Sequence, residues 1–406
     1  MSKTMSVLKF LIITLLFFLP FGEILRFDVG NDIFIKPLDL TAIVVFFCVT
    51  FVYFCNKSYR AKLRWYYFLF PLVGLISLIV NTVWLQPNEL FTSFLYLLRW
   101  ISYLSIFFVV ILFDKEFKKK IISLLIADGI VVLVIGYLQF FLYPNLKNLF
   151  YLGWDDHLYR LFSSFLDPNF AGAFLVLYLI FIAGLFFNRD KTVSRNRSLF
   201  YGFLIIATLI AIFLTYSRSA LLMLLVSGVT FLLLLQKRKY ILGLIGAMVL
   251  FVIVISPYFY LENINLLRVK SSIARIQTSE HALKIIADHP IIGVGFDSYR
   301  YAQERYHFKK KQTKYPAHSA SGVDMSLLFV FATTGIVGLV AYGYLWIRLY
   351  KRARVAITAN KNIYAIIFLS SSAGLFINAL FINSLFFPAI MLWMWIILGL
   401  FEEKKN

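Results

Sequence analysis

Three basic side chains stand where a membrane protein could use them for chemistry. Arg99 interrupts an apolar run, Arg218 lies in a short polar turn between two apolar stretches, and His318 lies just before another. A guanidinium offers several fixed hydrogen-bond donors to phosphate oxygens. A neutral imidazole can accept a proton from an attacking hydroxyl. These residue types indicate an anionic substrate with proton transfer nearby.

Each of these side chains also has a simpler explanation. Arg99 either holds an anion or forms an ion pair with Asp128 on the next apolar stretch, because a charge in hydrocarbon is costly unless it is paired or faces a wet cavity. Arg218 either binds a substrate phosphate or reaches the phosphates of membrane lipids. His318 either takes part in the reaction or is an idle surface histidine. Position along the chain leaves both interpretations open in each case.

A second polar group surrounds Pro168. Asp167 and Asn169 flank this proline, which suits the first turn of a helix, so helix capping explains both residues without a ligand. Upstream, Arg160 and the Asp-Asp-His run at 155–157 are polar enough to contact a sugar. A metal is the weaker interpretation of that run, because no second cluster with ligand spacing accompanies it.

The apolar composition of the chain indicates that membrane-spanning helices position these residues. Of 406 residues, 61% are hydrophobic and 15% are charged, and the mean hydropathy is +0.81. Polar residues are too few to cover the surface of a water-soluble domain. About 20 apolar residues suffice for a helix to cross the membrane, so the sequence predicts an all-α polytopic membrane protein with about twelve transmembrane helices. The predicted spans are residues 7–25, 37–55, 65–84, 90–113, 120–143, 169–187, 198–216, 219–235, 240–257, 323–347, 363–383 and 386–401.

Basic residues are distributed unequally between alternate loops. The chain has 40 Lys and Arg against 20 Asp and Glu, a formal net charge of +20. Twenty-four of the 40 lie at the two ends and in one set of loops, including 348–362, and only five lie in the alternate short loops, including 26–36. Because short cytoplasmic loops carry the excess of Lys and Arg, both termini are expected in the cytoplasm. Topology thus explains the basic excess without nucleic acid.

One connection, residues 258–322, is much longer than the others and is expected to be external. Connections of this length are usually functional or disordered. Apolar residues recur at helical spacing through 275–287, and Pro290 ends the run. We therefore expect a short amphipathic helix at the outer membrane surface, followed by a turn and a basic stretch. The whole chain, 1–406, is predicted to be a single integral membrane domain that contains this loop.

The sequence offers no site for a soluble nucleotide. It has neither a Walker-type loop nor a Gly-x-Gly-x-x-Gly motif after a strand, and no predicted cytoplasmic segment is long enough to fold as a catalytic domain. A donor substrate must therefore arrive already activated, through the membrane. No cofactor is expected.

Four segments in order resemble the O-antigen ligase and polymerase superfamily of bacterial membrane glycosyltransferases. The first is Arg-Leu-Phe-Ser-Ser-Phe-Leu-Asp-Pro-Asn at 160–169, and the second is Thr-Tyr-Ser-Arg-Ser-Ala at 215–220. The third runs over 275–295 and ends in His-Pro-Ile-Ile-Gly-Val-Gly; the fourth, at 318–339, contains Asp-Met-Ser-Leu-Leu and Thr-Gly-Ile-Val-Gly-Leu. The resemblance is firmest over residues 155–345.

This resemblance implies a metal-independent, inverting glycosyltransferase with a GT-C-like architecture. Its donor would be an undecaprenyl-diphosphate-linked glycan at the outer face of the bacterial cytoplasmic membrane, and its acceptor another glycan or a lipid. In that family, arginines at positions like Arg218 and Arg275 hold the diphosphate, and a histidine like His318 acts at the acceptor or donor end. These three are the expected catalytic residues. The expected substrate-binding residues are Arg160, Asn169, Arg99 and Ser217.

Three functions remain open. The first is a polymerase that joins lipid-linked repeat units of a surface polysaccharide, O-antigen or capsule, with a chain-length regulator as a further partner. The second is a ligase that transfers the glycan to a lipid A core, as in lipopolysaccharide, or to another acceptor. Ser319 favours the polymerase, because ligases often have Asn there; Ser279 stands where the family commonly has an aromatic residue. The third is a transporter, which needs charges near the membrane midplane, where only Arg99 and Asp128 are available.

Overall fold

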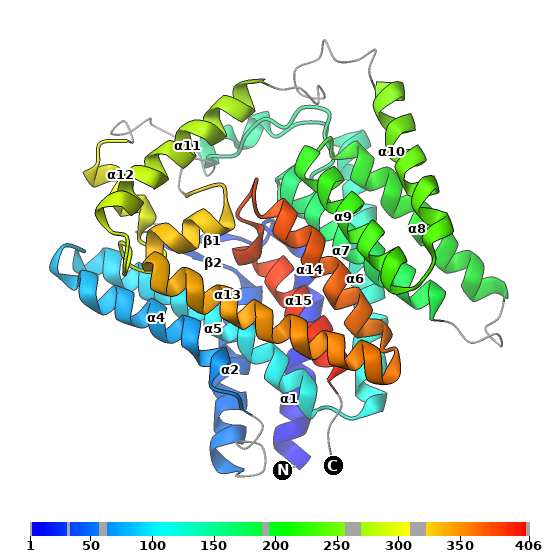
Figure 1. Ribbon diagram of the computed structural model, residues 1–406, viewed down its shortest axis with the longest axis horizontal. Coiled ribbons are helices and arrows are strands. Elements are labelled where there is room, and N and C mark those ends of the chain that lie inside the picture. Colours follow the sequence, from blue (N-terminus) through cyan, green and yellow to red (C-terminus); the bar gives the residue numbers. More distant parts are fainter. Residues whose placement is uncertain are drawn as a thin grey trace.

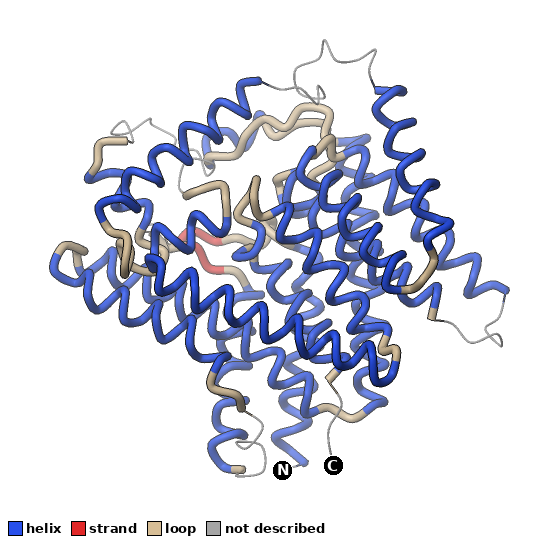
Figure 2. The backbone as a smooth tube through the Cα atoms, in the orientation of Figure 1, coloured by secondary structure: helices blue, strands red, loops and turns tan. Residues whose placement is uncertain are grey.

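The computed structural model is mostly helical (Figures 1 and 2). It describes residues 2–30, 33–56, 63–188, 195–255, 269–308 and 322–402. The described α-helices are α1 (Ser2–Phe18), α2 (Pro37–Cys55), α4 (Tyr66–Val80), α5 (Pro87–Leu112), α6 (Lys115–Leu142), α7 (Pro168–Phe187), α8 (Arg195–Leu214), α9 (Arg218–Leu234), α10 (Ile241–Ile255), α11 (Val269–Asp288), α12 (Tyr299–Arg305), α13 (Ser326–Asn360), α14 (Ile363–Asn378) and α15 (Pro388–Phe401). Short 3-10 helices are η1 (Leu19–Phe21), η2 (Asn81–Val83), η3 (Lys147–Leu152), η4 (Ser163–Phe165), η5 (Arg238–Tyr240) and η8 (Ser384–Phe386).

Each predicted apolar span contains a helix, although several helices end a few residues before the predicted bounds. Eight helical segments in the described ranges are long and apolar enough to cross a membrane. They are α2, α5, α6, α7, α8 and α13, together with α1 extended by η1 to Phe21 and α4 extended by η2 to Val83. Helices α9, α14 and α15 are apolar but have 17 residues or fewer, and α10 has 15. The chain is therefore a polytopic integral membrane protein, while the number of twelve spans stays a prediction.

Regular structure occupies parts of the loops predicted at 26–36 and 348–362. The predicted basic loop 348–362 is wrong over most of its length, because α13 continues to Asn360. Arg352 on this extension donates to Glu402 at 2.6 Å, which ties the end of the helix to the end of α15. In the loop predicted at 26–36, strands β1 (Phe27–Asp28) and β2 (Phe34–Ile35) form an antiparallel ribbon, a small departure from the all-α expectation.

Helix α15 forms the centre of the bundle, and every one of its residues is buried. It packs mainly against α5 and α14. At one end of the bundle, Lys118 of α6 donates to the carbonyl oxygens of Gly399 (2.9 Å) and Glu402 (2.7 Å). The two termini lie at this end (Figure 1). We call it the terminal end of the bundle.

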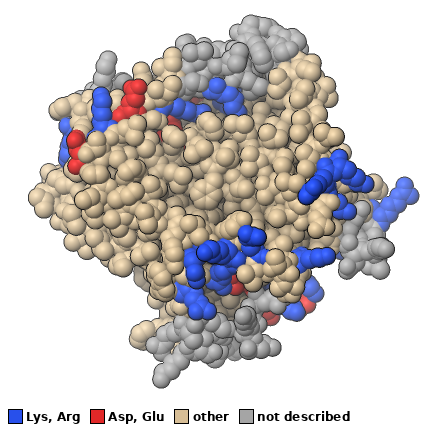
Figure 3. All heavy atoms as spheres, in the orientation of Figure 1, with Lys and Arg blue, Asp and Glu red and all other residues tan. Residues whose placement is uncertain are grey.

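Charged side chains are unevenly distributed on the face of the molecule shown in Figure 3. Figure 3 shows Lys and Arg gathered in the lower part, at the right edge, and at the upper left near α11 and α12, with a broad uncharged area between these groups. Helices α8 and α10 lie at the edge of the bundle, and many of their large apolar side chains are exposed. This distribution suits a lipid environment, because charges are costly in hydrocarbon and apolar side chains are not.

Helix α13 is interrupted at Gly335, whose φ of 66° and ψ of −169° are not helical. The segment that follows α11 lies against this interruption. Four backbone hydrogen bonds join the two segments: Val294 N to Ala332 O (3.0 Å), Gly295 N to Thr333 O (3.0 Å), Ile336 N to Pro290 O (2.8 Å) and Val337 N to Ile291 O (3.3 Å). We call residues 290–295 and 332–337 together the clamp.

The clamp leaves no room for side chains at its glycines. A Cβ on Gly335 would lie 2.1 Å from the carbonyl oxygen of Ile291, and a Cβ on Gly293 would lie 2.5 Å from the backbone of Thr333. From α4, the Ser77 hydroxyl reaches both the Ile292 carbonyl oxygen (2.7 Å) and the Thr333 carbonyl oxygen (2.9 Å). The clamp thus fixes α11 relative to α13 through backbone atoms.

Candidate active site

The helices α7 and α9 begin side by side. Asp167 caps α7 by accepting a hydrogen bond from the amide of Asn169 at 2.6 Å, which confirms the predicted capping role of Asp167. Ser217 caps α9, and its hydroxyl donates to the Asn169 side-chain oxygen at 2.9 Å. A Cβ on Gly172 would lie 2.6 Å from Cβ of Ala220, so the first turns are in close contact. Asn169 and Ser217 therefore join two helix N-termini.

Both caps follow a residue in the left-handed region. Leu166 has a φ of 55° and Tyr216 a φ of 47°. Non-glycine residues held there cost about 1–3 kcal/mol each and cluster at functional sites. The two helix N-termini lie next to each other, and their dipoles favour an anion there.

Arg160 lies next to the starts of α7 and α9. Its side chain is buried, and Nε donates to the Thr215 carbonyl oxygen at 2.9 Å. Gln139 of α6 accepts hydrogen bonds from the amides of Phe162 (2.8 Å) and Ser163 (3.1 Å) and donates to the Arg160 carbonyl oxygen. Arg160 thus ties the segment before α7 to the turn before α9. Sequence reasoning missed Gln139, although a polar residue inside an apolar span was a signal.

Arg218 and Arg275 come close together from different elements. Arg218 is the first residue of α9 and is half-buried, and Arg275 is half-buried on α11. Burial, together with the positive charge of Arg275, lowers the pKa of the Arg218 guanidinium. Figure 1 shows α11 crossing the end of the bundle opposite the termini. The two guanidinium groups repel each other, and an anion bound between them would relieve that repulsion.

Asp324 completes this group, and sequence reasoning did not assign it to the site. It lies two residues before α13, and its carboxylate accepts a hydrogen bond from the Thr278 hydroxyl at 3.4 Å. Burial raises the pKa of Asp324, Arg275 and Thr278 oppose that rise, and Asp167 and Asp155 add to it. The α7 start, α11 and the α13 start therefore meet around one set of charges. Asp324 was present in the quoted Asp-Met-Ser-Leu-Leu segment, but nothing in the sequence paired it with α11.

Other expected site residues lie elsewhere or beyond the described ranges. His318 lies outside the described residues, as does Ser319. Ser279 donates to the Arg275 carbonyl oxygen at 2.8 Å and so packs on the turn that carries this arginine. The predicted amphipathic helix at 275–287 is confirmed as a helix, but it is longer, since α11 begins at Val269.

Arg99 belongs to a different cluster. Its Nε lies 3.1 Å from Oδ1 of Asp39 on α2, and both side chains are largely buried. The Tyr103 hydroxyl donates to the same oxygen at 2.7 Å. The predicted pairing of Arg99 with Asp128 is wrong, because α5 packs against α2 at this position. Asp128 is buried on α6, and its Oδ2 has no hydrogen-bond partner in the part of the chain that the structure describes.

This second cluster extends over several elements. The guanidinium carbons of Arg99 and Arg300 lie 5.6 Å and 5.0 Å from the ring centroid of Tyr96. Arg300 also pairs with Asp297 at 3.2 Å, just before α12. Since each of these arginines has its own carboxylate, ion pairing accounts for the buried charge of Arg99 without a ligand.

The geometry defines a class of protein before any comparison. It is a polytopic membrane protein in which two helix N-termini, two guanidinium groups and a carboxylate meet at the end of the bundle opposite the termini. Donors of this kind bind phosphate groups and stabilise charge that develops on them. In the described ranges, no group of three or more His, Cys, Asp or Glu side chains could hold a metal ion.

Comparison with known proteins gives one family match, over about a third of the chain. Residues 202–343 match the family model described as O-antigen ligase, which confirms the resemblance of the chain to the O-antigen ligase and polymerase superfamily. The matched segment contains Arg218, Arg275, Asp324 and the clamp. No curated protein matches the chain. The family match indicates a glycosyl-transferring membrane enzyme whose substrates are a lipid-linked glycan and an acceptor.

Proposed function

We propose that the protein is a glycan polymerase, which transfers a growing chain from undecaprenyl diphosphate to another lipid-linked repeat unit. The observation that carries the proposal is the convergence of Arg218 and Arg275 at the paired starts of α7 and α9. This arrangement provides fixed donors for a diphosphate on a membrane-embedded carrier. The reaction would take place at the outer face of the bacterial cytoplasmic membrane, with both termini in the cytoplasm.

In this proposal the acceptor hydroxyl attacks the anomeric carbon of the donor sugar from the side opposite the diphosphate, so the configuration inverts. The bond from the anomeric carbon to the diphosphate oxygen breaks, and the departing diphosphate gains negative charge. Arg218, Arg275 and the amides of the two helix starts stabilise that charge, a contribution that needs no metal. His318 orients the attacking hydroxyl and accepts its proton. Asp324 holds Arg275 in position through electrostatic attraction and Thr278.

Arginine substitutions test the diphosphate site. Arg218→Ala should lower the rate of polymer formation by about 100-fold or more, as loss of a fixed donor to a developing anion does elsewhere. Arg218→Lys should recover only part of it, because an ammonium group cannot form a bidentate contact. His318→Ala should abolish long-chain surface polysaccharide. Arg238→Ala is the matched control, since this exposed arginine follows the other end of α9. Unchanged chain length in both Arg218→Ala and His318→Ala, with normal membrane levels, contradicts the proposal.

A ligase is the second candidate, favoured by the description of the matching family model. Both activities use the same donor and differ in the acceptor. Deletion of a polymerase should leave single repeat units on the lipid carrier, whereas deletion of a ligase should leave full-length polymer stranded there. Analysis of carrier-linked glycans from a deletion strain therefore separates the two.

A further inference from the structure

A groove lies between three helices at the terminal end of the bundle, far from Arg218 and Arg275. Its volume is about 400 Å³, within the range of about 300–1,000 Å³ that is usual for ligand pockets. The last turns of α9, residues 346–358 of α13 and residues 368–376 of α14 form its walls. Helix α14 packs against both of the other helices (Figure 1). The wall residues that matter here are Leu234, Trp346, Arg354, Phe368, Ala373 and Phe376.

The groove is apolar inside and polar at its mouth. Trp346, Tyr350, Arg354 and Thr358 follow one another at four-residue intervals on the face of α13 that lines it. Trp346 is therefore ~12 Å from Arg354 along the helix axis. Arg354 is exposed, and its guanidinium carbon lies 5.8 Å from the Tyr350 ring centroid. The side chains thus change from aromatic to cationic along one line.

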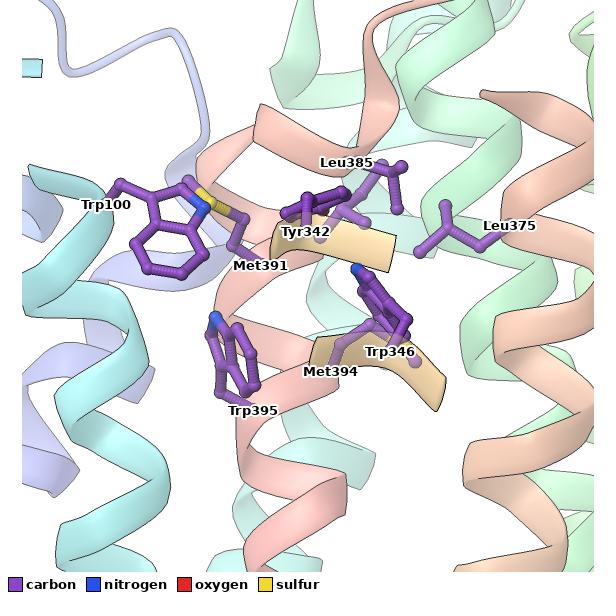
Figure 4. Close-up of a pocket in the computed structure, with 9 residues that line it drawn as sticks. Trp100, Tyr342, Trp346, Leu375, Leu385, Met391, Met394 and Trp395 are labelled. Carbon is purple, nitrogen blue, oxygen red and sulfur yellow. The ribbon is translucent and has the colours of Figure 1, made fainter. Parts of the chain in front are cut away.

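Trp346 closes the inner end of the groove. Its ring stacks on Phe368, with centroids 6.2 Å apart and planes at 11°, and meets the edge of Phe376 at 5.0 Å. Behind it lies only a small void of about 10 Å³ between Trp346, Trp100 and Trp395 (Figure 4). A void of that size holds at most one water molecule. An occupant therefore cannot extend past Trp346 toward the centre of the bundle.

We propose that the groove binds one anionic phospholipid of the leaflet at the terminal end, with an acyl chain against Trp346 and the phosphate at Arg354. The positive charge at the mouth and the apolar interior match the two ends of such a lipid. The glycan carrier is a poorer match, because its diphosphate belongs at Arg218, at the opposite end of α9 and ~25 Å away. The bound lipid braces α9 against α13 and α14.

Lipid binding to the purified, delipidated full-length protein tests this site. We expect phosphatidylglycerol to raise the melting temperature and, in native mass spectrometry, to bind about fivefold more tightly than phosphatidylcholine with the same acyl chains, the preference expected from one basic residue at a membrane surface. Arg354→Gln should remove the preference. Ala373→Phe should fill the groove and remove binding of both lipids. Lys351→Gln is the matched control, because this exposed lysine of α13 does not line the groove.

Several results overturn the proposal. Arg354→Gln that retains the preference shows that the mouth does not select an anion. Wild-type binding by Ala373→Phe shows that lipid binds elsewhere. Binding of a polyprenyl phosphate in preference to phosphatidylglycerol, lost in Ala373→Phe but kept in Arg354→Gln, assigns the groove to the carrier tail instead. If Ala373→Phe fails to fold, the comparison of Arg354→Gln with Lys351→Gln still decides the outcome.

Discussion

Replacing Gly335 by alanine tests whether the clamp holds α11 and α13 together. Holding alanine at the φ and ψ of Gly335 costs about 1–3 kcal/mol. The new Cβ would lie 2.1 Å from the Ile291 carbonyl oxygen, so residues 290–295 must move. Loss of the two hydrogen bonds that Ile336 and Val337 donate costs a further ~1–3 kcal/mol. The free energy of unfolding should therefore fall by about 2–6 kcal/mol.

Thermal unfolding of the full-length protein in a mild detergent measures this loss, and surface polysaccharide length reports its effect on activity. Gly343→Ala provides the control on the same helix, because nothing lies within 4 Å of its added Cβ. Alanine is the better helix former, so this variant should equal the wild type or gain up to about 1 kcal/mol. If the Gly335→Ala protein has the melting temperature of the wild type and makes polysaccharide of normal chain length, the structural role of the clamp is refuted.

Charge and capping give three more predictions, each measured by thermal unfolding. Burial raises the pKa of Asp324, so the folded state holds its proton to higher pH than the unfolded chain does. Stability should therefore fall as pH rises between the folded and unfolded pKa values. Asp324→Asn should make the melting temperature less dependent on pH over this range, and an unchanged dependence would contradict the raised pKa. Asp39→Ala should cost about 3–5 kcal/mol by leaving Arg99 unpaired, and adding Arg99→Met should recover most of it; no recovery argues against the ion pair. Ser217→Ala should cost about 1–2 kcal/mol by removing a helix cap and its bond to Asn169, whereas an unchanged melting temperature would show that neither interaction stabilises the fold.

The sequence predicted the helices well because long apolar stretches in a membrane chain have few alternatives. Asp167 was predicted as a cap because capping depends on neighbours in the chain. The end of α13 was missed for a related reason: Arg348 and its basic neighbours mark a loop by the charge rule, yet Lys, Arg and Ala are good helix formers. Charge thus indicated the side of the membrane and not the local conformation.

Long-range pairing could not be predicted. Asp39 and Asp128 are both plausible partners for Arg99, and the choice depends on which helices pack together. The association of Asp324 with Arg275 likewise requires α11 to fold back over the start of α13. The clamp that produces this fold uses backbone groups, so only its glycines were visible in the sequence.

Because the clamp holds α11 at its C-terminal end, a small tilt of the helix about the clamp would displace Arg275. Arg275 is 14 residues before His289, where the helix joins the clamp, and so lies ~21 Å from its pivot along the axis. A tilt of about 10° would carry the guanidinium ~4 Å, more than the length of a hydrogen bond. In the proposed function, the position of Arg275 relative to the diphosphate therefore depends on the stiffness of the clamp, which begins two residues after α11 ends.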